Sequence, residues 1–488
     1  MNLLTASVDY ETDKNGQISN ELTQTRLNNA ITQQYYQNDL ANSHYQGFDA
    51  SLNYQLGFKK SKDQLLTLSY KYSYSPNTQI TNNRFSDTIN YPQSNYNQYN
   101  NAGTREHTIQ LDYAQPLSKK FSIEAGAKAI LRNDFSDFQS DTLNNKSNEF
   151  ELDPTQSNDF TYHQNIYSVY NSYQLKLTKW TAKAGLRLEE TTVGADFSSV
   201  DTTLKTSYTN LIPSISIQRS LTSTSSINFG FTERIQRPDI YQLNPFVNRS
   251  NPQFITQGNP DLKPELNHVF ELNYSQFSKG SINLGLSYSF SNNSIQNVSN
   301  LTGDNVTYST YENLGSNSSL GLNVNTNYPI TTKLSLSING QINRVWLKGV
   351  YDGSLDKNTG YVGNMFTNIS YKFDDGYRIG TNSGYFSGNV NLQGTTSYFI
   401  FNSYVFSKDL LKKNATISFV ANNPWSKFWI GNSYTRTTDF YQENNNYNTY
   451  RTFAIRLSYK FGKLNSDIKK NQHGINNDDT KGKSSSNN

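Results

Sequence analysis

Apolar and polar residues alternate with a period of two in one segment after another along this chain. Residues 66–74 show the pattern most clearly, with Leu66, Leu68 and Tyr70 separated by polar side chains. Successive side chains of a strand point to opposite faces, so the pattern predicts strands with one apolar and one polar face. No run approaches the roughly 18 consecutive apolar residues of a transmembrane helix. The chain is therefore constrained to a sheet whose two faces meet different surroundings.

The composition restricts the class of sheet. Of the 488 residues only 34% are hydrophobic, yet the chain contains 35 Tyr and 27 Phe. A soluble protein of this polarity would lack core material, and a disordered chain would lack the aromatic residues. A barrel with a lipid-facing outside, a wet lumen and polar loops needs this mixture. Lipid offers no hydrogen-bond partners, so every backbone N–H and C=O of a crossing segment must be paired within the protein. Among strand structures, only a closed barrel meets this condition. We therefore predict an all-β, transmembrane, antiparallel up-and-down β-barrel.

Short and long connections alternate between the predicted strands. The first strand is expected over residues 3–12, with a polar loop before its return near 45–58. A short turn follows at residues 59–63, and a long Asn, Tyr and Gln loop is expected at 76–103. This alternation is typical of barrels with brief periplasmic turns and large extracellular loops. The count is about 18 strands. Aromatic residues beside the short turns fit an interfacial girdle: Phe58, Phe121, Trp180, Tyr328, Phe373, Tyr377 and Phe406.

The segment 231–274, here called the signature segment, connects two such strands through a proline-rich stretch. Its prolines are Pro238, Pro245, Pro252, Pro260 and Pro264. Proline fixes φ and removes a backbone donor, so no strand or helix is expected to pass through this connection intact. We predict an ordered loop.

Three short motifs stand in this loop: Arg234-Ile-Gln-Arg237-Pro238, Gln242-Leu-Asn-Pro-Phe246 and Gly258-Asn-Pro-Asp-Leu-Lys-Pro-Glu265. Together, in this order, they resemble the signature of barrels of TonB-dependent receptors and the related outer-membrane β-barrel family of Gram-negative bacteria. The resemblance implies a 22-strand barrel around an N-terminal plug domain, with uptake energised through an N-terminal box that binds TonB. Neither plug nor box is present here. The chain is therefore expected to be an N-terminally incomplete, C-terminal barrel portion.

The resulting functional prediction is a receptor-like barrel, integral to the outer membrane, that binds or takes up a nutrient or large substrate. A structural or adhesive barrel and a passive porin-like channel are the alternatives. Expected partners are outer-membrane lipid, a plug domain and TonB through regions absent here, and a surface lipoprotein. Residues 1–462 are expected to form the barrel. Residues 463–488, rich in Lys, Asn, Asp and Ser, are expected to be a disordered polar tail in the periplasm.

The signature segment has two interpretations. In one, Arg234, Arg237, Tyr241 and Asn244 face the lumen and contact a ligand or a plug. In the other, which we favour, the prolines fix the turns, Asn259 and Asp261 bond nearby backbone, and Leu262 anchors the loop in a crevice. The candidate residues are Arg234, Arg237, Pro238, Tyr241, Asn244, Pro245, Gly258, Asn259, Pro260, Leu262, Lys263, Pro264 and Glu265.

Other residues indicate little chemistry. The five histidines show no catalytic or metal-ligand spacing, there is no cysteine, and the net charge of +4 gives no footprint for nucleic acid. We predict no enzyme activity, no metal site and no cofactor. Loop tyrosines Tyr91, Tyr96 and Tyr99 could stack on a ligand, but a solvated loop is the favoured interpretation. The charges Arg187, Glu189 and Arg456 are expected to pair across the wall of the lumen.

Overall fold

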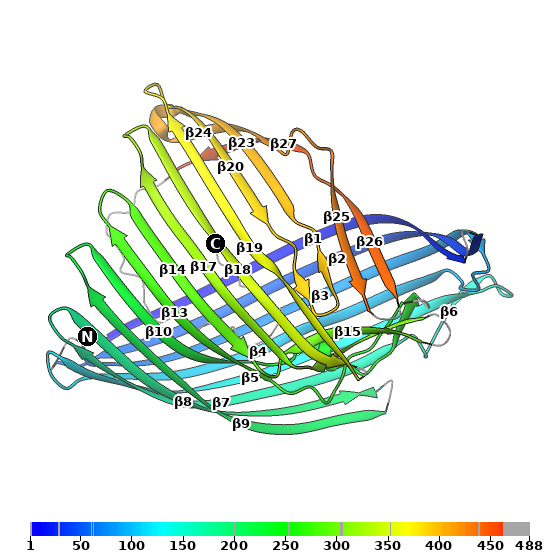
Figure 1. Ribbon diagram of the computed structural model, residues 1–488, viewed down its shortest axis with the longest axis horizontal. Helices are drawn as coiled ribbons and strands as arrows, with labels where there is room; N and C mark the ends of the chain where they lie inside the picture. The colour runs from blue at the N-terminus through cyan, green and yellow to red at the C-terminus, as the bar shows by residue number, and fades with distance from the viewer. Residues whose placement is uncertain are drawn as a thin grey trace.

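A computed structural model describes residues 2–461 apart from 28–29, 60, 62, 199–200, 252–253, 303–305, 352 and 438–439. The predicted tail lies outside the described residues. One large antiparallel sheet of 19 strands dominates the described chain (Figure 1). Among these residues, no helix has the length and hydropathy that a membrane crossing requires.

Eighteen strands of this sheet follow one another in chain order as hydrogen-bonded neighbours, and β6 (Glu149–Leu152) adds to the end of β5. The eighteen are β1 (Asn2–Leu27), β2 (Ala30–Gly57), β3 (Leu65–Ile89), β4 (Tyr96–Pro116), β5 (Phe121–Asn144), β7 (Asn158–Lys176), β8 (Trp180–Phe197), β9 (Thr202–Ser220), β10 (Ser225–Gln236), β13 (Glu265–Phe277), β14 (Ser281–Ser291), β17 (Ser316–Pro329), β18 (Leu334–Tyr351), β19 (Ser354–Lys372), β20 (Tyr377–Phe386), β23 (Phe399–Leu410), β24 (Ala415–Asn422) and β27 (Thr452–Tyr459). The predicted all-β meander and its strand count are confirmed.

The outer face of the sheet is a belt of exposed apolar side chains. Leu272 of β13 lies opposite Phe229 of β10 and Leu286 of β14, and Leu286 lies opposite Leu322 of β17. The three leucines are 43–50% exposed. Exposed leucine in register on strand after strand is what a lipid-facing wall requires. Trp180, Tyr328 and Phe406, beside short turns, are exposed as well, in keeping with the predicted girdle.

The loops predicted at the far ends of the strands are wrong in part. Residues 13–27 and 30–44 continue β1 and β2, with Gly16 opposite Asn42, and residues 76–103 are mostly β3 and β4, with Thr78 opposite Asn101. Backbone pairing holds a hairpin together even when both faces are wet, so strands extend beyond the point where apolar alternation stops. Alternation marks the lipid-facing part of a strand and not its whole length.

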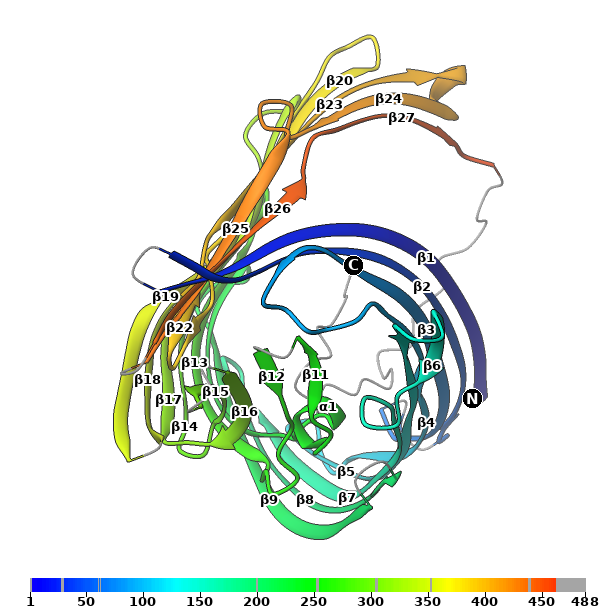
Figure 2. The same cartoon turned by 90° about the vertical axis from the view of Figure 1, so that its right-hand side faces the viewer.

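The polar connections after β10 and β14 fold inside the curve of the sheet (Figure 2). The first contains α1 (Ile240–Leu243), β11 (Asn248–Asn251) and β12 (Phe254–Thr256), and the second contains β15 (Ile295–Leu301) and β16 (Thr307–Asn313). Strands β11, β12, β16 and β15 form a separate four-stranded sheet. We call this unit the lumen insert.

As expected, no helix or strand runs through the described part of the proline-rich connection from end to end, but the connection contains short elements rather than loop alone. The prolines limit the length of the elements instead, since α1 begins after Pro238, ends before Pro245 and is only four residues long. The side chain of Asp239 caps it by accepting a hydrogen bond from the Gln242 backbone N–H at 2.9 Å. A short capped helix fits between two prolines where a long one could not.

A third sheet lies farther along the chain and consists of β21 (Val390–Asn391), β22 (Gly394–Thr396), β25 (Phe428–Arg436) and β26 (Tyr441–Thr449). A 3₁₀ turn, η2 (Leu411–Lys413), joins β23 to β24. The last strands of the large sheet swing away from β1, so that the β1 and β27 edges stand apart in Figure 2.

Candidate ligand site in the lumen

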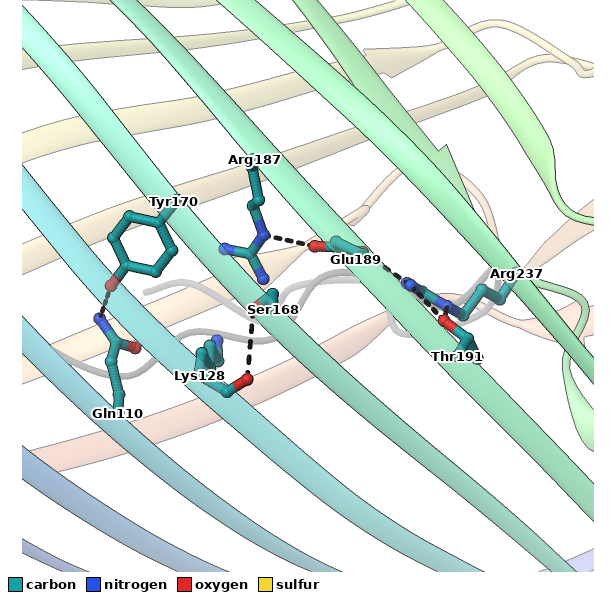
Figure 3. A network of polar contacts seen from close by, with 8 residues as sticks. All are labelled: Gln110, Lys128, Ser168, Tyr170, Arg187, Glu189, Thr191 and Arg237. Atoms are coloured by element: carbon teal, nitrogen blue, oxygen red, sulfur yellow. Dashed lines mark hydrogen bonds and ion pairs between the residues drawn. The ribbon is translucent and has the colours of Figure 1, made fainter.

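An arginine of the signature segment is tied to the wall of the lumen (Figure 3). Arg237 is 1% exposed, and its Nη2 donates to Glu189 Oε2 at 2.7 Å and to Thr191 Oγ1 at 2.9 Å. Glu189 also pairs with Arg187, two residues earlier on β8. Alternation along β8 directs all three wall side chains to the same face. The Arg237 guanidinium thus holds the start of the lumen insert against β8.

The polar network continues around the wall toward β4 in Figure 3. The Arg187 Cζ atom lies 5.4 Å from the centroid of the Tyr170 ring. The Tyr170 hydroxyl donates a hydrogen bond to Asp112 and accepts one from Gln110 Nε2. The prediction that lumen charges pair holds for Arg187 and Glu189, but on one strand rather than across the wall. Arg456 lies on the edge strand β27 and is exposed.

Hydrogen bonds and apolar packing fix the second half of the signature loop, from Asn259 onward. The Asn259 side chain donates to the Tyr311 carbonyl at 2.9 Å and accepts from the Asp261 backbone N–H at 2.9 Å. Leu262 is 8% exposed, within an apolar cluster that joins the insert to the wall strands β7 and β8. Glu265 is buried and accepts a hydrogen bond from the Ile295 backbone N–H at 2.5 Å.

Two further contacts complete this anchoring. The Lys263 backbone N–H donates to Asn313 Oδ1 at 2.7 Å, while Pro260 and Pro264 are half-buried beside it. Gly258 brings the two halves of the loop together, since a Cβ there would meet the Asn244 carbonyl oxygen at 2.5 Å. Only glycine permits this approach. These contacts are those of the rigid-loop interpretation.

Other candidate residues line cavities. Arg234 and Arg237 line one, whereas Tyr241, Asn244 and Gly258 line another. Pro238 is buried, and the Pro245 carbonyl accepts from Gln257 Nε2 at 2.7 Å. The candidate residues that line cavities are thus divided between two separate cavities.

Sequence reasoning missed a second buried network in the wall. Arg132 of β5 forms an ion pair with Glu106 of β4 at 2.7 Å, and its Nη1 donates to Gln164 of β7 at 2.6 Å. All three are at most 5% exposed. Their alternation looks like that of any wet lumen wall. No sequence signal distinguished them from solvated charges.

The expectation that Tyr91, Tyr96 and Tyr99 lie in solvated loops is wrong for the first two. Tyr91 and Tyr96 are 9% and 8% exposed, and the Tyr91 ring stacks on Tyr35 with centroids 4.1 Å apart. Tyr99 remains 42% exposed. Ring packing between long hairpins buries the first two.

Three cavities line the lumen and share residues. A charged cavity of about 600 Å³ contains Lys128, Arg187, Glu189, Glu233, Arg234 and Arg237. A neutral cavity of about 470 Å³ shares Asn267 and Ser289 with it. An aromatic cavity of about 340 Å³ shares Tyr311 with the neutral one.

Neutral groups dominate the second and third cavities. Burial is the main factor that raises the pKa of the Tyr311 phenol above its ordinary value, and nearby Asp239 adds to it, so this hydroxyl stays protonated. Within the described ranges, His, Asp and Glu side chains form no cluster of three or more that could hold a metal ion. The arrangement offers hydrogen bonds and aromatic surface.

Comparison with known proteins decides the family. Residues 57–459 match the outer membrane protein beta-barrel family. The chain belongs to this family. This barrel is therefore an integral protein of the bacterial outer membrane. It matches no curated protein sequence at a significant level.

Solved structures show the same fold for this outer-membrane barrel. It resembles the unliganded ferric citrate transporter FecA with a TM-score of 0.60 at 14% identity, over 93% of this chain and 70% of that one. The copper transporter OprC gives 0.55 at 11% identity, over 94% and 80%. The FrpB iron transporter of Neisseria meningitidis (F5-1 variant) gives 0.53 at 11%, over 94% and 82%. The predicted kinship with TonB-dependent receptors is confirmed at the level of the fold.

Proposed function

We propose that this chain forms the barrel of an outer-membrane receptor that binds a nutrient from outside the cell and takes it up through the lumen. The main support is that the lumen insert folds inside the sheet and leaves cavities of about 340–600 Å³ beside it. Cavities of roughly 300–1,000 Å³ are the size that binds small molecules. The named transporters with the same fold support the same class of function.

Uptake by this receptor is energised, with a plug domain and TonB as partners. A passive channel needs an open lumen, whereas here an anchored insert lies inside the curve of the sheet. The anchor is dry and charged: Arg237 and Glu189 are 1% and 5% exposed. Such an anchored insert suits a gated receptor, in which the cargo is bound first and a later conformational step releases the cargo.

The test uses the source bacterium with the encoding gene deleted or restored, and with tonB deleted. Uptake of labelled ferric complexes, cobalamin and oligosaccharides is measured with and without a protonophore. We expect uptake of at least one nutrient to require the gene, TonB and the proton gradient. Uptake that needs the gene but continues without TonB would identify a passive channel. Loss of cell adhesion with every uptake rate unchanged would identify an adhesive barrel.

A further inference from the structure

The two cavities next to the lumen insert differ from the charged cavity in their lining. Eight of the residues that line the neutral cavity are Asn or Gln, and none of its lining residues is charged. The aromatic cavity adds four more amides and likewise has no charged residue among its lining residues. A side-chain amide both donates and accepts hydrogen bonds. Such a surface matches a ligand whose groups do the same.

The aromatic cavity also offers ring surface. Its rings are Phe138, Phe160, Tyr241, Phe246 and Tyr311. Tyr241 is 67% exposed although it stands on α1, inside the curve of the sheet. The rings of Phe138 and Phe246 meet with centroids 6.3 Å apart, which joins the wall strand β5 to the insert. An exposed ring on an anchored loop is a rigid apolar platform with low entropic cost of binding.

Charge and polarity exclude two other ligand classes. An anionic or cationic ligand buried here would lose water without gaining an opposite charge, which is costly. A purely apolar ligand would remove water from the polar groups that line both cavities, which is costly too. A ring-shaped ligand with hydroxyl groups around its edge and C–H groups on its faces satisfies both the amides and the aromatic rings.

We propose that the neutral and aromatic cavities bind a neutral oligosaccharide, with Tyr241 as a stacking platform and the surrounding Asn and Gln side chains as hydroxyl partners. This inference rests on the proposed receptor function and names its substrate class. The two cavities share Tyr311, so they form one elongated site for several linked sugar units. The charged cavity lies next along the lumen, through Asn267 and Ser289.

Binding is tested by calorimetry with the purified full chain in detergent. The probes are neutral glucose, xylose and mannose oligomers of three to seven units, the matching uronic-acid oligomers, and ferric citrate. We expect at least one neutral oligomer to bind, and its uronate counterpart to bind about tenfold more weakly or worse. Tyr241→Ala should weaken binding about tenfold or more, while Tyr241→Phe, which keeps the ring, should stay within about threefold.

Tyr447→Ala is the matched control, since Tyr447 is 68% exposed on β26 and lines none of the three cavities. It should bind like wild type. Binding of uronates or ferric citrate in preference to neutral oligomers would overturn the inference, and so would binding of none of the probes. Energised uptake of a charged nutrient would then leave the receptor function standing. Saccharide binding without energised uptake would instead support the substrate class and overturn the receptor function.

Discussion

Arg237, a candidate ligand or plug contact in the sequence, is tied to the wall strand β8 in the structure. A charged residue in a loop motif is a reasonable candidate for binding. The Arg237 side chain is instead 1% exposed and forms an ion pair with Glu189, whose side chain is 7% exposed. Partners on β8, 46 and 48 residues away in the chain, decide this role. No local pattern in the sequence reveals them.

Replacing Arg237 with Ala should destabilise the barrel, because it leaves part of a buried carboxylate charge uncompensated. Breaking a buried ion pair costs about 3–5 kcal/mol. Arg187 remains as a second partner of Glu189, so we expect the lower end, about 3 kcal/mol. The measurement is equilibrium urea unfolding of the protein in detergent or lipid. Adding Glu189→Gln to Arg237→Ala should recover part of the loss.

Lys183→Ala provides the matched comparison for Arg237→Ala. Lys183 pairs with Glu124 at 2.7 Å, but both side chains are over 40% exposed. A solvated pair contributes about 0–1 kcal/mol. Equal losses for the two variants would mean that the Arg237 pair is solvated in the membrane protein and does not anchor the insert.

At the scale of elements, alternation predicts the lipid-facing strands well and their ends poorly. Leu66, Leu68 and Tyr70 fall within β3 as expected. The same strand continues to Ile89 through residues whose polar side chains show no such pattern. The site divides in the same way: motifs locate the signature loop, while Leu262 and Glu265 gain contacts from strands elsewhere in the chain.

The two faces of one strand should respond differently to the same charge. Leu272 of β13 faces lipid, while Glu271 beside it points to the lumen side. Leu272→Arg should destabilise the barrel by about 2–4 kcal/mol, the cost of arginine near the bilayer midplane, while Glu271→Arg should cost far less. Heat-modifiable mobility on gels measures the folded fraction in membranes. Equal folding of both variants would contradict the assigned faces.

At the scale of the whole molecule, the edges of the sheet set the remaining structural question. Among the described residues, β1 and β27 each pair with one neighbour only, β2 and β24. Unpaired backbone is costly in lipid, so both edges need partners in the membrane. A barrel of 22 strands, as the family resemblance implies, would place further strands between them. Direct pairing of β1 with β27 would instead close a smaller barrel.

Engineered disulfides distinguish these two closures, and the chain suits the method because it contains no cysteine. Cysteines at Leu4, Ala6 or Val8 of β1 are combined one at a time with Ile455→Cys of β27 in native membranes. We expect no cross-link, since a disulfide needs Cβ atoms about 3.5–4.5 Å apart and the two edges stand apart in Figure 2. Ser226→Cys with Ser275→Cys, opposite each other on β10 and β13, should cross-link readily. An efficient cross-link from β1 to β27 would show that eighteen strands close the barrel by themselves.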